Sequence, residues 1–358
     1  MSRERAADMA ELQATACAEL GSPLYAALLR RVADDIRTGG PCAEAVAGYE
    51  EAPGPAAIAL RLLGGVHGLV LTGRAPELAA HYPSAGGAFD PRRPDAAWPA
   101  FRAAVAAELP WVRDWMTRPP QTNEVGRANL LIAGLLTAVE TFQLPVRLFE
   151  LGASAGLNLR AEQFHYIAQD YRWGPATSPV VLDAAWRGTP PEWLTRAATR
   201  HPSITVVERR GCDLNPVDPL SADGALALRA YVWPDQTARF ARLEGALGVA
   251  AEIPAEVAAM GAADFLSGVE PREGTLTVVW HSVMRQYVPK EEWALVQTQL
   301  DELAAASTPQ AGFAHIAFEP GRVGEQHRFR LTVRLGESAE ADLAEAAPHG
   351  LPAQGPQP

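Results

Sequence analysis

The chain has 358 residues, 48% of them hydrophobic and 20% charged, so it can bury a core and is long enough for one large domain or two ordinary ones. Its 31 lysine and arginine residues against 42 acidic residues give a net charge of −11, which argues against nucleic acid as a partner. The cysteines at 17, 42 and 212 lie far apart and indicate neither a zinc site nor a disulfide framework.

The first twenty residues are charged and helix-like, with no apolar signal region. No later stretch has the roughly 18 or more apolar residues in a row that a spanning helix needs. We therefore expect a soluble, cytoplasmic protein with no membrane partner.

Residues 1–142 are predicted to form an all-helical N-terminal domain. Ser22 and Pro23 are typical of a helix start, and Gly39 and Gly40 end the apolar periodicity that follows them. Further helices are expected over residues 56–71, 97–116 and 124–142.

From Val146 onward, short apolar runs alternate with helical or turn segments, which is typical of an α/β domain with a mostly parallel sheet. Strands are predicted at residues 146–151, 204–212, 275–282, 312–319 and 328–335. The segment from about 164 to 200 is rich in Trp, Pro and Gly and is expected to be an insertion. We expect the α/β domain to cover residues 143–340 and the tail 341–358 to be mobile.

Two functions fit the sequence Gly152-Ala153-Ser154-Ala155-Gly156, which follows the first predicted strand. It matches G-x-S-x-G, the turn that exposes the nucleophile of an α/β-hydrolase. That fold needs several strands ahead of the serine and an oxyanion loop, whereas the preceding residues are predicted to be helical. A serine hydrolase using Ser154 is therefore kept only as a less favoured alternative.

The other interpretation is a glycine-rich loop that holds a cofactor. Glu150 lies at the strand end, Gly152 allows a tight turn, and Ser154 and Gly156 are small enough for a ligand to approach. The helix after the loop would direct its unpaired N–H groups at that ligand.

Polar residues also end the later strands. Asp213 follows the second long strand and can accept hydrogen bonds from both hydroxyls of a ribose, and Asp264, in a predicted loop, is suited to an adenine amino group. His281 ends a further apolar strand and can act there as a general base. Such residues gather at the carboxyl edge of a parallel sheet.

This order resembles that of class I S-adenosylmethionine-dependent methyltransferases, whose first strand is followed by E/D-x-G-x-G-x-G. The resemblance covers about Val146 to Leu335 and implies a Rossmann-like domain that binds S-adenosylmethionine. It implies the following contacts: Glu150, Gly152, Ser154 and Gly156 around the methionine portion, Asp213 on the ribose and Asp264 near adenine. His281 would face the substrate.

Two features depart from that pattern. Ser154 replaces the usual middle glycine, and 57 positions (213 minus 156) separate Gly156 from Asp213, against about 20 in Rossmann-type folds. The insertion must therefore loop out for Asp213 to reach the glycine loop.

End to end, the chain also resembles a bacterial family defined as domain of unknown function 2332. The stretches that carry this likeness are LTGRAPELAAHYPSAGG, QTNEVGR, ELGASAGLNL, GCDLNPVDP, YVWPDQ and VVWHSVMRQY. The family has no reaction to transfer to this chain.

Three residues outside the cofactor set are candidates for catalysis beside His281. Glu124 and Arg127 lie three positions apart, hence on one helical face, where Arg127 can hold a substrate carboxylate; the alternative is a capped helix with an ordinary ion pair. Tyr287 can add a hydroxyl or can simply be packing. No metal site is predicted.

The sequence favours a methyltransferase for a small-molecule acceptor, with the helical domain roofing the acceptor pocket. A non-catalytic binder and non-methyl chemistry on S-adenosylmethionine remain as alternatives. The oligomeric state stays open.

Overall fold

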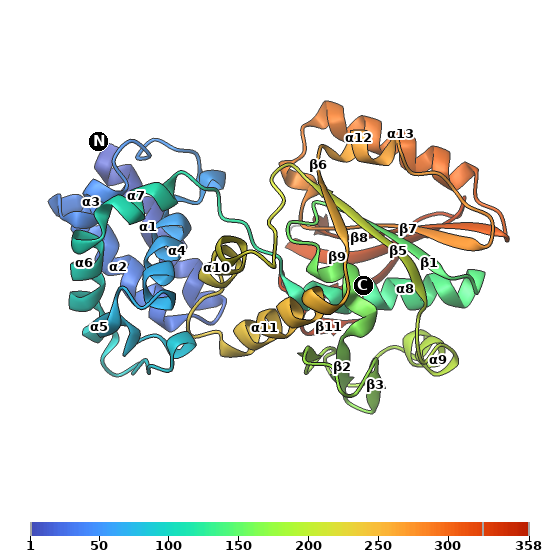
Figure 1. Cartoon of the computed structure of the whole chain (residues 1–358), viewed down its shortest axis with the longest axis horizontal. Coiled ribbons are helices and arrows are strands. Elements are labelled where there is room, and N and C mark those ends of the chain that lie inside the picture. Colours follow the sequence, from blue (N-terminus) through green and yellow to red (C-terminus); the bar gives the residue numbers. More distant parts are fainter. Residues whose placement is uncertain (1, 324–325, 357–358) are drawn as a thin grey trace. The chain divides into compact units, whose positions relative to one another are not determined.

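The computed structural model describes residues 2–323 and 326–356. The chain divides into two compact units: Met1–Thr122 with Ser221–Ala241, and Asn123–Leu220 with Arg242–Pro358. Figure 1 shows both units.

In the part of the chain that is described, the first unit is built from helices. They are α1 (Ser2–Glu19), α2 (Pro23–Thr38), α3 (Pro41–Ala45), α4 (Ile58–Leu71), α5 (Pro76–Ala79), α6 (Trp98–Ala107), α7 (Leu109–Met116) and α10 (Ala222–Ala230), with short 3₁₀ turns at Gly54–Ala56, Pro83–Ala85 and Pro94–Ala97. The predicted start of α2 is confirmed, because Ser22 caps it and Pro23 opens it, and its end at the left-handed Gly39 is confirmed as well.

The second segment of this unit is fastened to the first by hydrogen bonds. Asp235 accepts from the Ser22 hydroxyl at 2.6 Å and from the Leu24 amide at 3.0 Å, so it reinforces the N-terminus of α2. His67, on α4, lies 3.1 Å from the carbonyl oxygen of Ala230. Residues 221–241 therefore belong to the helical unit, although the sequence places them within the predicted α/β domain.

The second unit is built on one eight-stranded sheet in the order β11-β10-β9-β8-β7-β1-β5-β6. Its strands are β1 (Val146–Leu151), β5 (Val206–Asp213), β6 (Glu256–Ala259), β7 (Thr275–Ser282), β8 (Ala311–Val323), β9 (Gln326–Leu335), β10 (Ala341–Ala346) and β11 (Ala353–Gln354). The strands from β6 to β8 run parallel, whereas β9, β10 and β11 are added antiparallel. The five predicted strands and the α/β class with a large, mostly parallel sheet are confirmed.

Helices cover both faces of this sheet, α8 on one face and α12 and α13 on the other (Figure 1). Their bounds are α8 (Ala128–Phe142), α12 (Ala262–Leu266) and α13 (Lys290–Ala305); α11 (Thr237–Glu252) runs from the first unit into the second. All six residues of β1 are buried, which explains why this strand reads as an apolar run.

Helix α8 accounts for the most apolar helical segment of the chain. Residues Val125–Phe142 are long and apolar enough to span a membrane by length and composition alone, but 72% of that window is buried inside the protein. Its apolar residues pack on the sheet, where Gly134 lies against Ile316 of β8.

Two helical glycines test this packing. A Cβ at Gly134 would lie 2.7 Å from a methyl carbon of Ile316, whereas a Cβ at Gly248, in α11, meets nothing within 4 Å. We expect Gly248→Ala to raise the free energy of unfolding by roughly 0.5–1 kcal/mol, and Gly134→Ala to lower it by about 1–3 kcal/mol through overpacking. Urea unfolding of both variants measures the difference, and equal stabilisation by both would contradict the close contact.

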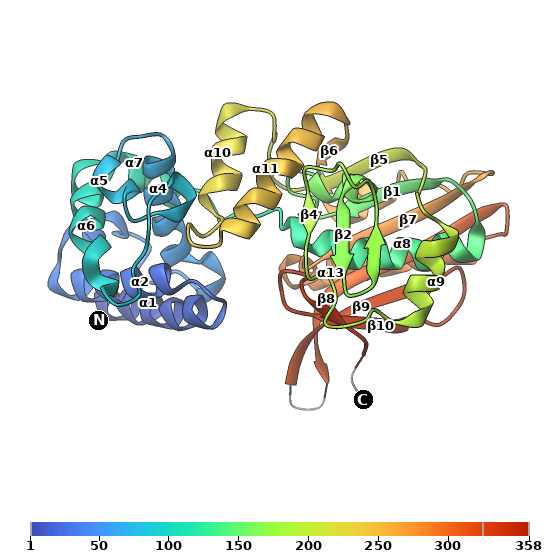
Figure 2. The same ribbon diagram turned by 90° about the horizontal axis from the view of Figure 1, so that it is seen from below.

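The predicted domain boundary at residue 142 differs from the observed division, because α8 packs on the sheet and belongs with it. The predicted insertion forms a three-stranded sheet, β3-β2-β4, followed by α9 (Figure 2). The bounds are β2 (His165–Ala168), β3 (Tyr171–Trp173), β4 (Val181–Leu182) and α9 (Glu192–Arg200).

The prediction of a mobile tail over residues 341–358 is wrong for its described part. Residues Ala341–Ala346 pair with β9, and Ala353 exchanges backbone hydrogen bonds with Ala185 and Arg187 of the insertion. The ladder is made by main-chain groups and is crossed by two ion pairs, Arg328–Glu345 at 3.0 Å and Arg330–Asp342 at 2.7 Å, so it forms without apolar periodicity in the sequence.

Candidate active site

The loop between β1 and the next element carries three residues in the left-handed region, and we call Gly152–Gly156 the glycine turn. The φ angles are +68° at Gly152, +54° at Ser154 and +66° at Gly156. Glycine takes such angles without strain, but serine does so at a cost, so Ser154 is held there by its surroundings.

Asp213, at the end of β5, supplies that restraint. Its carboxylate accepts a hydrogen bond from the Ser154 amide at 3.0 Å and, through the other oxygen, from the Asn215 amide at 2.9 Å. The Ala153 amide also donates to the Cys212 carbonyl at 2.9 Å. The insertion loops out as the distant spacing requires, and it brings Asp213 to the glycine turn.

Glu150 lies on β1 just before the turn and is buried. One of its oxygens accepts from the indole N–H of Trp280 at 3.0 Å, and the other is buried without a hydrogen-bond partner. Burial raises the pKa of Glu150 to about 8, although the Trp280 hydrogen bond and the charges of Arg127 and Arg160 act in the opposite direction. The carboxyl therefore keeps its proton at neutral pH.

The element after the turn is not the α-helix that the sequence predicts. It is a seven-residue 3₁₀ segment, Leu157–Gln163, interrupted by the non-helical angles of Arg160. The first amide of this segment, that of Leu157, donates to the side-chain oxygen of Asn123 at 2.7 Å. A helix N-terminus with free N–H groups is thus absent at this position. Any ligand must instead be bound by the backbone of the glycine turn and by the carboxyl groups beside it, Glu150 and Asp213.

Residues 123–127 lie against the glycine turn. The side-chain amide of Asn158 donates to the Glu124 carbonyl at 3.2 Å, and the buried Glu124 carboxylate accepts from the backbone amide of Gly126 at 3.0 Å. Its second oxygen lies 3.3 Å from Nδ1 of His349. Glu124 is thus the N-cap of a 3₁₀ turn, Val125–Arg127, and not part of a helical face shared with Arg127.

Arg127 links this segment to the carboxyl end of β7. Its guanidinium donates to the Pro348 carbonyl at 3.1 Å and to the Ser282 carbonyl at 3.3 Å. The structure therefore places Glu124 and Arg127 beside the glycine turn at the edge of the sheet, and it holds both largely through contacts with the backbone.

His281 is buried at the end of β7, and both of its ring nitrogens are occupied. Nδ1 lies 2.8 Å from an oxygen of Glu319, and Nε2 lies 3.0 Å from Nε2 of His315. The prediction of a general base open to a substrate is wrong for this geometry, because neither nitrogen has a free lone pair directed at a ligand.

The two partners of His281 escaped prediction, although the sequence carried a signal for them. His315 and Glu319 lie four positions apart on β8, which places both on one face of that strand, and β8 runs beside β7.

Two predicted site residues lie at the surface. Tyr287 is 68% exposed in a 3₁₀ turn after β7, and Asp264 is exposed within α12 rather than in a loop. Neither lines the two cavities described below. The Ser154 hydroxyl is buried without a partner, so no histidine activates it as a hydrolase triad requires.

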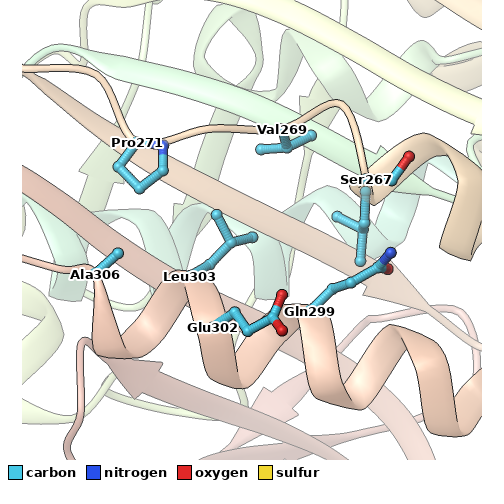
Figure 3. Close-up of a pocket in the computed structure, with 8 residues that line it drawn as sticks. Ser267, Val269, Pro271, Gln299, Glu302, Leu303 and Ala306 are labelled. Atoms are coloured by element: carbon cyan, nitrogen blue, oxygen red, sulfur yellow. The ribbon is translucent and has the colours of Figure 1, made fainter.

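Two cavities of ligand size lie in the second unit. One, of about 370 Å³, adjoins the glycine turn at Ala155 and is bounded by Arg160, by residues 216–220 after Asp213, and by Val257 of β6. The other, of about 350 Å³, lies between α13 and the segment 266–271 that leads to the amino end of β7 (Figure 3). Because ligands of parallel sheets bind at the carboxyl edge, the first cavity is the candidate for a cofactor.

Among residues 2–323 and 326–356, no three histidine, cysteine or carboxylate side chains gather in a way that could hold a metal ion. A family described as "Uncharacterized protein conserved in bacteria (DUF2332)" matches residues 7–354. No curated protein and no solved structure matches the chain.

Proposed function

We propose that this chain, which belongs to the family of uncharacterized bacterial proteins DUF2332, is an S-adenosylmethionine-dependent methyltransferase acting on a small-molecule acceptor. One observation carries the proposal: the glycine turn at the carboxyl end of β1 is clamped by Asp213 from the end of β5. This is the pairing of a glycine-rich loop with an acidic strand end that nucleoside cofactors require.

The order of the parallel strands supports a Rossmann-like interpretation. Numbered along the chain, β1, β5, β6, β7 and β8 stand in the spatial order 3-2-1-4-5, which begins the order of doubly wound dinucleotide-binding sheets. In such a sheet the strand order reverses beside the first strand, and ligands bind in the crevice there. The reversal here falls between β1 and β7, where the glycine turn and Ser282 lie.

The residues at this edge suit the parts of the proposed cofactor. Glu150 and Ser154 each have a buried oxygen without a partner, and these atoms suit the polar methionine portion. The carboxylate of Asp213, at the end of β5 beside the glycine turn, is of the acceptor type that suits a ribose hydroxyl. Asp264 would reach adenine only if α12 or its neighbours move.

S-adenosylmethionine supplies an electrophilic methyl group on a sulfonium. The protein's part is to orient the acceptor against that group and to exclude water. Arg127 and Glu124, at the adjoining edge, are the side chains we assign to the acceptor, and His281 takes no proton because its nitrogens are occupied. The net charge of −11 favours a small molecule over nucleic acid as acceptor.

Titration calorimetry of the purified chain with S-adenosylhomocysteine, S-adenosylmethionine and NAD tests the proposal. We expect micromolar binding of the first two and no binding of NAD. Binding without methyl transfer to any acceptor would favour a non-catalytic binder, and a product of different mass would indicate non-methyl chemistry. Absence of binding would refute the proposal, and fluorophosphonate labelling of Ser154 would be the next experiment.

Asp213→Ala should weaken S-adenosylhomocysteine binding by about 1.5–3 kcal/mol, because the variant loses charge-assisted hydrogen bonds to the turn and to the ribose. Titration of the variant beside Asp183→Ala measures this. Asp183 is the matched control, since it is exposed and accepts only from the neighbouring Ala184 amide. Equal affinities of both variants would remove Asp213 from the cofactor site.

A further inference from the structure

Three buried or nearly buried side chains form a continuous hydrogen-bonded array behind the candidate site. His315 Nε2 lies 3.0 Å from His281 Nε2, and His281 Nδ1 lies 2.8 Å from Oε1 of Glu319. Two imidazoles can share such a bond only when a single proton lies between the two nitrogens. Both contacts therefore hold only while one of the two facing nitrogens is unprotonated.

The array ends on the backbone of the loop after β7. Oε1 of Glu319 also accepts from the Met284 amide at 3.0 Å and from the Arg285 amide at 3.4 Å. Just before these residues, Val283 has a φ of +52°, which is an outlier for a β-branched residue. A strained loop of this kind persists only where its surroundings hold it, and Glu319 supplies that hold.

Met284 connects the array to the glycine turn, because Glu319 binds its amide and its side chain lies against Gly152. A Cβ built on Gly152 would lie 2.9 Å from Cβ of Met284 and 3.1 Å from its Cγ, so the side chain covers Gly152. The position of Met284 thus decides how much room a ligand has beside the turn. This links His315, in the interior, to the surface where the cofactor is proposed to bind.

The charges around the two histidines favour a single shared proton. His281 faces Glu319 and His315 and packs edge-on against Trp293, whose ring has the Arg285 guanidinium 5.2 Å away. His315 lies near Arg334 of β9, which is itself ion-paired with Asp301. Burial, followed by His281 and Arg334, lowers the pKa of His315 well below its usual value, so a second proton enters only in acid.

We propose that Glu319, His281 and His315 are positioning residues that fix Met284 against Gly152, and that protonation of both facing Nε2 atoms of the histidine pair releases Met284. The effect on cofactor binding rests on the proposed function, whereas the position of Met284 does not. When both facing Nε2 atoms carry a proton, the shared bond is lost and the two N–H groups repel each other. Because Oε1 of Glu319 accepts from His281 and from the Met284 amide, displacement of the His281 ring also displaces the carboxylate that holds Met284.

The methyl resonance of Met284 reports this directly, because the sequence has only five methionines and Met284→Leu assigns the signal in a ¹³C-methyl spectrum. In the wild-type chain we expect this resonance to stay constant from neutral pH down to mildly acidic pH and to move in stronger acid. In His315→Leu it should be displaced already at neutral pH and lose its acid-dependent movement. His315→Gln can still donate to His281 and should restore the wild-type position at neutral pH.

His327→Leu is the control, since His327 is an exposed histidine of β9 whose loss should leave the Met284 resonance and its pH dependence unchanged. A Met284 resonance that is identical in wild type and His315→Leu, or that still moves with acid in His315→Leu, would overturn the proposal.

Calorimetry with S-adenosylhomocysteine gives the second readout. We expect His315→Leu to bind about five- to tenfold more weakly than wild type and His315→Gln to bind nearly as well, in line with the loss and recovery of one hydrogen bond. If the wild-type chain does not bind at all, the proposed function fails while the Met284 resonance still decides the positioning role. If the chain binds but His315→Leu binds equally well, the positioning role is refuted and the proposed function stands.

Discussion

Glu150→Gln is expected to stabilise the protein at alkaline pH and to weaken its binding of S-adenosylhomocysteine. The folded chain raises the pKa of Glu150 from an unfolded value of 4.5 to about 8. Between pH 4.5 and about 8, Glu150 is ionised in the unfolded chain and protonated in the folded chain. The free energy of unfolding therefore falls by about 1.4 kcal/mol per pH unit as the pH rises through this range. Above pH 8 the loss levels off.

Glutamine has no proton to lose, and it keeps an oxygen for the Trp280 indole. The variant should therefore match wild type within about 1 kcal/mol near pH 5 and exceed it by roughly 2–4 kcal/mol above pH 8. Its affinity for S-adenosylhomocysteine should fall at least about tenfold, because a buried carboxyl kept at such cost is typical of a functional site.

Urea unfolding at pH 5, 7 and 9 measures the stability difference. The exposed Glu337, replaced by Gln, is the control and should show no pH-dependent difference from wild type. If the stability difference between Glu150→Gln and wild type is the same at pH 5 and pH 9, folding does not raise the pKa of Glu150, and the prediction fails.

The sequence predicts the sheet well because buried parallel strands have a strong apolar pattern. The strand at Thr275–Ser282, for example, is buried along seven of its eight residues. The edge strand Glu256–Ala259 was missed, since its four residues are short, small and partly exposed. The strand Ala341–Ala346 was missed for the same reason: it pairs through its backbone, and its side chains carry little signal.

The candidate site, like the sheet, has parts that the sequence predicts and parts that it does not. The glycine turn and Asp213 could be predicted because strand ends of a parallel sheet meet at one edge, whatever the length of the insertion between them. The partners of His281 could be predicted only in part: the spacing of His315 and Glu319 puts both on one face of a strand, but the register that sets His281 beside Ala317 cannot be derived from one sequence. His315 and Glu319 flank that position on the same face and so reach the imidazole.

The boundary between the two units depends on contacts that are remote in sequence. Asp235 joins the helical unit through Ser22, 213 positions away, and no local pattern records such a contact. The helix at residues 124–142 is predicted by its apolar periodicity, but the unit to which it belongs is not, because an amphipathic helix of one domain and a sheet-covering helix of the next have the same periodicity.

Gly152→Ala is expected to destabilise the protein and to lose cofactor binding. The φ of +68° at Gly152 costs an L-residue about 1–2 kcal/mol, and the new Cβ would lie 2.9 Å from Cβ of Met284. The Met284 Cβ belongs to a strained loop fixed by Glu319 and cannot rotate away, so the backbone must move. We expect a total loss of roughly 2–4 kcal/mol in the free energy of unfolding.

Gly188→Ala separates the two causes. Gly188 has a φ of +71° but nothing lies within 4 Å of its built Cβ, so this variant has the conformational strain without the clash. It should lose only about 1–2 kcal/mol and bind S-adenosylhomocysteine like wild type. Gly152→Ala should bind at least about tenfold more weakly, because displacement of the turn misaligns the Ser154 amide and Asp213. Equal stability and equal affinity of the two variants would show that the turn needs glycine for its backbone angle alone and that no ligand approaches it.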